Sequence, residues 1–527
     1  MEKNDRANFS GGFTNSSFLS DEYKMESINS VDTKPKTQNL NGRPTGYLLF
    51  CISVSVIGAA FQVGWNIGVY NTPIDVIKDF FNQTNFDRNK EYMSQSRFDL
   101  LWSVTNGLLP LGAAFGGISS GLIADKFGRK NGMILTNIFV IICGVLNLIS
   151  KFVKAYETLI VARFFSGLFC GLFTGILPLY LTELPPQNLR GSAGTLNQLL
   201  IVLGILITNI MGLRDILGSE DRWPILVTIM LAPALAHIGL FFAAESPKYL
   251  YIKKNNPELA RETLKRLRGY NENLVNAEMK MLQDEKIAMD SQKEVSWGDL
   301  FTVPSLRHPL IIAVCIHIAQ QFSGINAVIF YSTNIFKSVG LKDQWPLYAT
   351  ILLGVVQLVM TLVCTVIIEK AGRKILLLIG MGGMCLSSFG IGLTRIFSGE
   401  AEWLNYLTVV FSVFYIIFFS IGPGAIPWIM TSELFKSNAR AKANSIAVFV
   451  NWTSAFIVTV SFQFIEAAIG DYSFILFGGL LVFFTLFMLF FVPETKNRTV
   501  EEITEAFAYQ TLFLFNNSKK KEMTVRF

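Results

Sequence analysis

Polar side chains that could bind a ligand interrupt a long apolar run in the second half of the chain. The stretch QQFSGINAVIFYST, residues 320–333, begins with the neighbouring amides Gln320 and Gln321, and Asn326 follows. Carboxamides in hydrocarbon are costly unless they are hydrogen-bonded or face a wet cavity, so polar residues at membrane depth predict a functional site. Because amides are uncharged and both donate and accept hydrogen bonds, the stretch favours a neutral polyhydroxylated solute over an ion.

The same amides could instead only join neighbouring helices, as polar residues in membrane bundles often do. This stretch alone supports both interpretations equally, and the rest of the chain has to decide between them.

The composition is that of a protein that crosses a membrane many times. Of the 527 residues, 51% are hydrophobic, and the mean hydropathy is +0.42. A membrane-spanning helix needs about 20 mostly apolar residues. The sequence therefore predicts an all-α membrane protein with twelve transmembrane helices. These cover residues 46–70, 100–123, 131–150, 158–180, 192–213, 223–243, 309–335, 345–367, 374–394, 404–430, 444–464 and 473–492.

Lysine and arginine predict the orientation of these spans. With an even number of spans both termini share one side, and that side carries 33 of the 45 lysines and arginines. An excess of positive charge marks the cytoplasmic side. We therefore expect a multi-pass plasma-membrane protein with both termini in the cytoplasm, and we interpret the net charge of +6 as a topology signal rather than a nucleic-acid surface. The sequon at Asn82 lies in the long first loop on the other side, where a glycan could be added.

Residues with the spacing of a catalytic or metal site are not found. All six cysteines lie inside apolar spans, where they behave as small buried apolar residues rather than as a disulfide framework. The histidines His237, His308 and His317 have no ligand spacing, and we expect His237 and His317 to be packed and neutral. We expect no cofactor, and no nucleophile–base pair supports a membrane enzyme.

Charged motifs recur at a nearly constant offset, which predicts two copies of one unit. GLIADKFGRK recurs as EKAGRK, TELPPQNLRG as SELFKSNARA, and AESPK as PETKN. The matching residues are Arg129 and Arg373, 244 residues apart, Glu183 and Glu433, 250 apart, Arg190 and Arg440, 250 apart, and Glu245 and Glu494, 249 apart. The repeats imply two six-helix bundles in parallel orientation. The expected segments are a cytoplasmic tail (1–45), a first bundle (46–247), a cytoplasmic linker (248–306), a second bundle (307–493) and a second cytoplasmic tail (494–527).

These charges could form a cytoplasmic gate. Exposed ion pairs contribute only about 0–1 kcal/mol each, so a network of them could bias two conformations without locking either. Retention of positive charge for topology is the simpler alternative, although it leaves the acids unexplained. The proposed gate residues are Asp125, Arg129, Glu183, Arg190, Glu245, Glu369, Arg373, Glu433, Arg440 and Glu494. Between the bundles, residues 251–290 fit either short amphipathic helices or a solvated linker.

Together these motifs closely resemble the facilitative glucose transporters (the GLUT family), in the sugar-porter branch of the major facilitator superfamily. The resemblance covers about residues 46–508 and includes GWNIGVYNTP, GLIADKFGRK, ARFFSGLFCG, LRGSAGTLNQL, QQFSGINAVIFYST, GPGAIPW, NWTS and PETKNRT. It implies a twelve-helix fold in two bundles, with a central sugar site that opens to one side at a time.

The resemblance also implies which residues contact the sugar. They are Gln198, Gln320, Gln321, Asn326, Gln357, Gly424, Trp428 and Asn451. Trp428 would cover the apolar face of a pyranose, although it could instead be an interfacial belt residue. Tyr331 resembles the outer gate over the sugar. Gly422, Gly424 and Pro427 would loosen the tenth span so that it can bend.

Ion coupling is not expected. Proton-driven relatives resemble this chain but carry an aspartate in the first span, near an arginine of the fourth, whereas here Asn66 stands opposite Arg163. Asparagine cannot titrate, so we expect passive uniport of glucose, with galactose, mannose and fructose as further candidates. A proton-coupled symporter and a transporter-like sugar sensor are the alternatives, and Val525-Arg526-Phe527 could offer a C-terminal carboxylate to a partner.

Several residues depart from the family pattern and bear on sugar selectivity. His317-Ile318-Ala319 replaces the Gln-Leu-Ser of members that are strict for glucose and is closer to members that also accept fructose. Gln357 stands in place of a usual asparagine, and Ser420 in place of a usual glutamate. These changes leave the hexose preference open.

Overall fold

Twelve helical spans lie in the part of the chain that the structure describes, in agreement with the prediction. The computed structural model describes residues 42–291, 295–496, 498 and 502–503, and every regular element among them is a helix. Eleven segments of this part are long and apolar enough to cross a membrane. The last of them, Asn438–Phe491, contains two helices joined at Gly470, which gives the twelfth span.

The first six spans are built from eight labelled α-helices, with a π-helical turn inside the first span and a 3₁₀ stretch ending the sixth. They are α1 (Gly46–Val56), α2 (Gln62–Gly68), α4 (Gln95–Phe127), α5 (Arg129–Ser150), α6 (Tyr156–Glu183), α7 (Arg190–Met211), α8 (Trp223–Thr228) and α9 (Leu231–Leu235). α3 (Ile74–Asn89) lies in the loop between the first two spans.

The last six spans contain two that are broken in the middle. They are α13 (Pro304–Phe322) with α14 (Ile325–Ser338), α15 (Trp345–Ala371), α16 (Arg373–Ile396), α17 (Trp403–Ile421) with α18 (Ile426–Glu433), α19 (Ser437–Ile469) and α20 (Ser473–Phe491). The joined pairs α13–α14 and α17–α18 are the seventh and tenth spans. The sequence predicted each of these spans as a single apolar stretch and did not locate the breaks within them.

The repeat is visible in the local geometry as well as in the sequence. A single glycine separates α4 from α5 and α15 from α16, and Gly128 and Gly372 both have φ of +94°. This left-handed conformation is accessible to glycine at little cost. The next helix begins directly after each glycine, at Arg129 and Arg373. The two halves therefore turn in the same way at the same point of the repeat.

Between the halves, residues 251–290 are largely helical. α10 (Pro257–Leu267) begins with an Asn256 cap whose side-chain oxygen accepts the Leu259 amide, and α11 (Glu272–Ser291) follows. Arg268 is buried and fixes both helices, because its guanidinium holds the Glu278 carboxylate at 2.8 Å and donates to the Leu184 carbonyl at 2.9 Å. These helices contact the first half of the chain.

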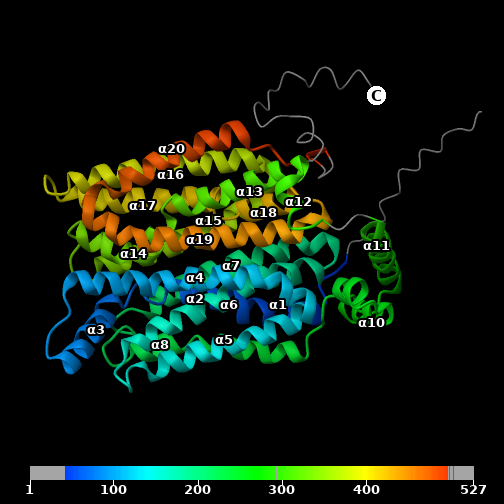
Figure 1. Cartoon of the computed structure of the whole chain (residues 1–527), viewed down its shortest axis with the longest axis horizontal. Helices are drawn as coiled ribbons and strands as arrows, with labels where there is room; N and C mark the ends of the chain where they lie inside the picture. Colours follow the sequence, from blue (N-terminus) through cyan, green and yellow to red (C-terminus); the bar gives the residue numbers. More distant parts are fainter. Residues whose placement is uncertain (1–41, 292–294, 497, 499–501, 504–527) are drawn as a thin grey trace, which may run out of the picture. The chain divides into compact units, whose positions relative to one another are not determined.

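The two halves meet along two pairs of helices. α4 packs along α19, and α7 packs along α15. In Figure 1 the helices of the first half, coloured blue to green, and those of the second half, coloured green to red, meet along α4 and α19. The end of the spans that carries the repeated charged motifs, together with α10 and α11, is called the motif end below, and the other end is called the opposite end.

Small residues let α4 and α6 approach closely. An added Cβ at Gly167 would lie 2.1 Å from the Leu109 carbonyl oxygen, and one at Gly112 would lie 2.3 Å from the Phe164 carbonyl oxygen. Small residues at such contacts are typical of helix packing in membranes. The close packing of α4 against α6 therefore requires glycine, which has no side chain, at these positions.

We expect Gly167→Val to prevent folding, because the branched side chain would have to push two backbones apart. Size-exclusion chromatography of detergent-solubilised protein should show little monodisperse material. Gly382→Val is the matched control, since nothing lies within 4 Å of an added Cβ there. A Gly167→Val protein as monodisperse as the control would contradict this packing argument.

Candidate functional site

The two broken spans expose backbone groups in the middle of the second half. Gly324, with φ of +92°, separates α13 from α14, and the Ser323 carbonyl oxygen accepts the Tyr415 hydroxyl at 2.5 Å. Between α17 and α18, the carbonyl oxygens of Pro423 and Gly424 accept side-chain hydrogen bonds instead of continuing a helix. Irregular backbone at membrane depth is tolerated where protein groups or a wet cavity satisfy it.

Four carboxamides join these breaks in one hydrogen-bonded chain, called the amide cluster below: Gln320, Gln321, Asn326 and Asn451. Asn326 donates to the Gln321 oxygen at 2.6 Å, and Gln321 donates to the Asn451 oxygen at 3.0 Å. Asn451 in turn donates to the Gln320 oxygen at 2.6 Å. All except Asn326 are buried. The cluster comes from α13, α14 and α19 and contains no charged group.

The cluster ends on the broken tenth span. Gln320 donates to the carbonyl oxygen of Pro423 at 2.6 Å and to that of Gly424 at 3.3 Å. Because a carbonyl can only accept, these contacts fix which end of the Gln320 amide is the donor. Both N–H groups of Gln320 are therefore occupied by protein in this conformation. Asn326 and Gln321 each use one N–H group within the described residues, so each has a second N–H group that a ligand could take.

Trp428 of α18 lies next to the cluster. Its ring is half-buried and meets the His317 ring edge to face, with centroids 4.9 Å apart. An aromatic face at this place can cover the apolar side of a ring-shaped ligand. The structure thus brings Gln320, Gln321, Asn326, Gly424, Trp428 and Asn451 together.

The remaining predicted site residues lie on other helices. Gln198 is half-buried on α7 and Gln357 is buried on α15, two helices that pack together. Neither side chain hydrogen-bonds to the amide cluster within the described residues. Tyr331 of α14 is buried, and its hydroxyl donates to the Thr459 carbonyl oxygen at 3.3 Å.

Arg163 is a buried charge inside a membrane span of the first half. Arg163 of α6 donates to the main-chain carbonyl oxygen of Asn66 at 2.5 Å and lies over the Tyr70 ring, with its guanidinium carbon 4.3 Å from the centroid. It also meets the Asn106 oxygen at 3.5 Å. Asn66 and Arg163 are neighbours, as predicted, but Arg163 contacts the main-chain carbonyl of Asn66 rather than its side-chain carboxamide.

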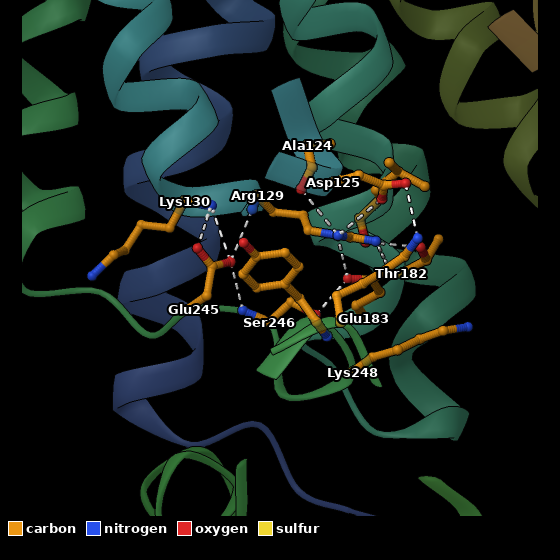
Figure 2. A network of polar contacts seen from close by, with 12 residues as sticks. Ala124, Asp125, Arg129, Lys130, Thr182, Glu183, Glu245, Ser246 and Lys248 are labelled. Atoms are coloured by element: carbon orange, nitrogen blue, oxygen red, sulfur yellow. Dashed lines mark hydrogen bonds and ion pairs between the residues drawn. The ribbon is translucent and has the colours of Figure 1, made fainter. Parts of the chain in front are cut away.

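At the motif end, the first copy of the charged motifs forms a compact network (Figure 2). The Arg129 guanidinium binds the Glu183 carboxylate at 2.8 Å, and both side chains are more than nine-tenths buried. Glu245 caps the start of α5, accepting the backbone N–H groups of Arg129 at 3.0 Å and Lys130 at 3.1 Å. The Ser246 hydroxyl donates to Glu183 and so links the two acids. Burial raises the pKa of the Glu245 carboxyl, and these backbone N–H groups oppose that shift.

The second copy repeats this arrangement. Arg373 binds the Glu433 carboxylate at 3.1 Å, and Glu494 accepts the backbone N–H groups of Arg373 at 2.9 Å and Lys374 at 3.1 Å. Thr495 donates to Glu433 at 2.5 Å, in the role that Ser246 has in the first copy. Each network therefore ties three spans of its own half together.

Other predicted charges take less part in these contacts. Asp125 lies 3.0 Å from the Lys253 ammonium, and Arg440 donates to the Phe435 carbonyl oxygen at 3.2 Å. Arg190 is exposed and makes no ion pair within the described part of the chain. The side chain of Glu369 lies outside what the structure describes. Asn82 lies on α3, and its side-chain oxygen is buried.

The described hydrogen bonds between the halves lie at the opposite end. Asn71 donates to the Ile329 carbonyl oxygen at 2.8 Å and to the Ser332 hydroxyl at 2.9 Å. Lys337 of α14 pairs with Asp75 of α3 at 2.5 Å. A further bridge runs from Ser103 through Gln463 to Asp99, at 2.9 and 2.8 Å. These contacts join the two halves at the opposite end.

We expect Lys337→Met to weaken the contact between the halves at the opposite end. The pair is partly exposed, so it contributes about 0–1 kcal/mol, which corresponds to at most about a fivefold shift between conformations. Spin labels at the exposed positions Gln83 and Glu402 should show a larger population with long distances. The exposed Lys342 provides the control, Lys342→Met, which should leave the distances unchanged. Identical distributions in both variants would show that the ion pair does not hold the halves.

Several residues of this arrangement were not singled out from the sequence. Asn71, Asp75 and Lys337 join the halves, and Thr431 bonds to His317 beside the cluster. His317 stands one helical turn before Gln320 and Gln321, so helical spacing already placed it on their face. The partners in the other half are hundreds of residues away, and only the tertiary structure shows them.

Comparison with known proteins supplies the family. The family model described as "Sugar (and other) transporter" matches residues 50–507. The chain is 42% identical over 467 residues to solute carrier family 2, facilitated glucose transporter member 3, of Mus musculus, covering 88% of this chain and 94% of that protein. The Homo sapiens protein of the same name is 41% identical over 467 residues, covering 88% and 93%.

Solved structures agree with this assignment. The proton:xylose symporter XylE bound to 6-bromo-6-deoxy-D-glucose superposes with a TM-score of 0.74 at 26% identity, covering 88% of this chain and 100% of that one. An inward-open structure of the xylose transporter XylE from E. coli gives 0.71 at 25% identity, covering 87% and 100%. With its twelve spans in two repeated halves, the chain belongs to the sugar transporter family of the major facilitator superfamily and, within it, to the facilitated glucose transporters of solute carrier family 2.

Proposed function

We propose that this membrane protein carries glucose, and with it other hexoses, down their concentration gradient by opening to one side of the membrane at a time. The observation that carries the proposal is the amide cluster, because it is uncharged, buried and joined to the broken tenth span. The names of its relatives support the same substrate. Galactose, mannose and fructose are the other candidates.

Weak binding suits this role, because a carrier has to release its cargo. A dissociation constant of about 1 mM corresponds to about −4 kcal/mol. Neutral hydrogen bonds contribute about 0.5–1.5 kcal/mol each, so a few amide contacts reach that value without any charge. Gln198 and Gln357 would add contacts from α7 and α15, the helices along which the two halves meet. Trp428 would cover the apolar face of the sugar.

Sugar binding would act on the broken tenth span through Gln320. Its two N–H groups hold the carbonyl oxygens of Pro423 and Gly424 in the present conformation. A sugar hydroxyl that takes one of these donors would release a backbone carbonyl and let α18 move relative to α17. Binding energy would thus be coupled to gating by competition for one amide.

The two ends of the spans would serve as the two gates. We place the opposite end outside the cell, where the contacts between the halves would form the outer gate with Tyr331 above the sugar. We place the networks of Arg129 with Glu183 and of Arg373 with Glu433 at the cytoplasmic gate. Each network joins helices of a single half. The proposed networks would therefore keep each half rigid while the halves rock against one another.

A coupled ion is not needed in this proposal. In the twelve spans, Asp and Glu occur only within the first or last five residues. Arg163 meets a backbone carbonyl and Asn106 instead of a carboxylate that could take up a proton. The structural likeness to a proton:xylose symporter keeps coupled transport as the second candidate.

The organisation predicted from the sequence forms part of the proposal. We assign residues 46–247 and 307–493 to the two bundles, 248–306 to the cytoplasmic linker, and the plasma membrane as the location with both termini in the cytoplasm. A glycan at Asn82 would then be added on the outer side. Digestion with a glycosidase that removes N-linked glycans, with Asn82→Gln as the control, tests this orientation.

Labelled glucose uptake into sealed proteoliposomes tests the function. We expect saturable uptake that unlabelled glucose suppresses and that protein-free vesicles lack. Competition by each of the other hexoses would define the selectivity. Uptake no faster than in protein-free vesicles, for every hexose, would contradict the proposal.

A further inference from the structure

His317 is enclosed beside the amide cluster, and both of its ring nitrogens have partners. Its side chain is fully buried on α13. Nδ1 lies 3.0 Å from the Asn451 amide nitrogen, and Nε2 lies 3.1 Å from the Thr431 hydroxyl of α18. A histidine with both nitrogens engaged has no atom left for a ligand. Its role must therefore be exerted through the residues that it touches.

The donor and the acceptor in each hydrogen bond of His317 follow from the bonds that its partners Asn451 and Thr431 make elsewhere. The carbonyl oxygens of Pro423 and Gly424 need donors, which makes the Gln320 oxygen the acceptor for Asn451. The Asn451 nitrogen then donates to His317 Nδ1 as well, and its two N–H groups are both used.

From the other end, the Thr431 hydroxyl has one hydrogen, and it donates that hydrogen to the Pro427 carbonyl oxygen at 2.8 Å. It must accept from Nε2, so His317 is the neutral tautomer with the proton on Nε2.

The same histidine also contacts Trp428. The two rings meet edge to face, with centroids 4.9 Å apart and an interplanar angle of 76°. Trp428 and Thr431 are three residues apart on α18, so they lie on the same side of that helix. His317 thus touches α18 twice, once through a hydrogen bond and once through a ring contact.

We propose that His317 and Thr431 form a bridge that positions two of the proposed sugar-contacting residues, Asn451 and Trp428, and thereby sets the affinity for glucose. The inference rests on the proposed transport function. His317 is a positioning residue in it, without direct sugar contact. The bridge spans α13, α19 and α18, so it also fixes the half-helix α18 against the amide cluster.

Removing only the Thr431 hydroxyl tests the bridge. In Thr431→Val the buried Nε2–H loses its acceptor, while side-chain shape is kept. We expect KM for glucose in proteoliposomes to rise at least fivefold, with kcat changed less than twofold. Thr431→Ser keeps the hydroxyl and should restore KM to within twofold of wild type.

Thr485→Val is the matched control, because among the residues that the structure describes that hydroxyl bonds only to the Leu481 carbonyl oxygen of its own helix. It should keep the wild-type KM. If the two residues act through one bridge, His317→Ala should raise KM, and adding Thr431→Val to it should raise KM no further. Additive effects of the two substitutions would overturn the bridge, as would a wild-type KM in Thr431→Val.

The histidine tautomer gives a readout that does not depend on transport or on the folding of the Thr431→Val and His317→Ala variants. The chain has three histidines. Nitrogen-15 magnetic resonance of histidine-labelled wild-type protein, assigned with His237→Gln and His308→Gln, should show His317 protonated on Nε2 alone. Protonation on Nδ1 would overturn the inference. Absence of hexose flux in the wild-type protein would instead refute the proposed function. If the wild-type and control proteins transport glucose and Thr431→Val has an unchanged KM, only the bridge would be refuted.

Discussion

Gln320→Ala should abolish most glucose flux while leaving a folded protein. The side chain makes three hydrogen bonds, to Asn451, Pro423 and Gly424, and all of these partners are buried. A buried polar group left without a partner costs about 1–3 kcal/mol, which is about fivefold to 150-fold in an equilibrium constant. The substitution would also remove the donors for which a sugar hydroxyl competes. We expect initial uptake in proteoliposomes to fall at least tenfold.

Gln283→Ala is the matched control, since Gln283 is exposed on α11 and far in sequence from the cluster. It should transport like wild type. A thermal unfolding scan in detergent separates lost function from lost folding, because the Gln320→Ala protein should still show a cooperative transition. Uptake at the wild-type rate by Gln320→Ala would exclude the amide cluster as the sugar site.

Trp428→Ala should weaken sugar binding strongly. Tryptophan is the largest side chain at the site, is half-buried, and lies against His317. Truncation of a tryptophan at the centre of a binding surface typically costs about 2 kcal/mol or more, which is about thirtyfold in affinity. We expect KM for glucose to rise by about that factor, with a smaller rise in Trp428→Phe, which keeps an aromatic face.

Trp403→Ala controls for the loss of an indole elsewhere. Trp403 begins α17 and is 64% exposed, so its removal should leave KM unchanged. If Trp428→Ala and Trp403→Ala had equal KM values, Trp428 would be an interfacial residue, which is the alternative that the sequence left open.

The organisation of the chain followed from its sequence, because it depends on features that are local or periodic. Apolar length predicted the spans, and the recurrence of Arg129 as Arg373 predicted two equivalent halves. Glycine at 128 and 372 adopts the same left-handed turn in both copies. The tenth span was expected to bend, since Gly422, Gly424 and Pro427 cluster there, and the structure shows a break between α17 and α18 at this place. Features of this kind can be predicted from the sequence, because each depends on residues that are close together along the chain.

The parts that were missed depend on contacts between distant residues. Gly324 breaks the seventh span inside an apolar run, where hydropathy alone cannot reveal a positive φ. The pairing of Asp75 with Lys337 joins residues from the two halves. Arg163 was placed near Asn66 correctly, but its choice of the backbone carbonyl is set by packing. His317 resembled any buried histidine until Asn451 and Thr431 were seen on its two nitrogens.

Simultaneous recording of labelled glucose and internal pH in sealed proteoliposomes tests the central claim most directly. The claim is that an uncharged site moves sugar without an accompanying ion. We predict that internal glucose rises to the external concentration and stops there, equally with and without an imposed pH gradient, and that sugar entry does not change the internal pH. Accumulation above the external concentration under a pH gradient, with protons entering alongside sugar, would contradict it.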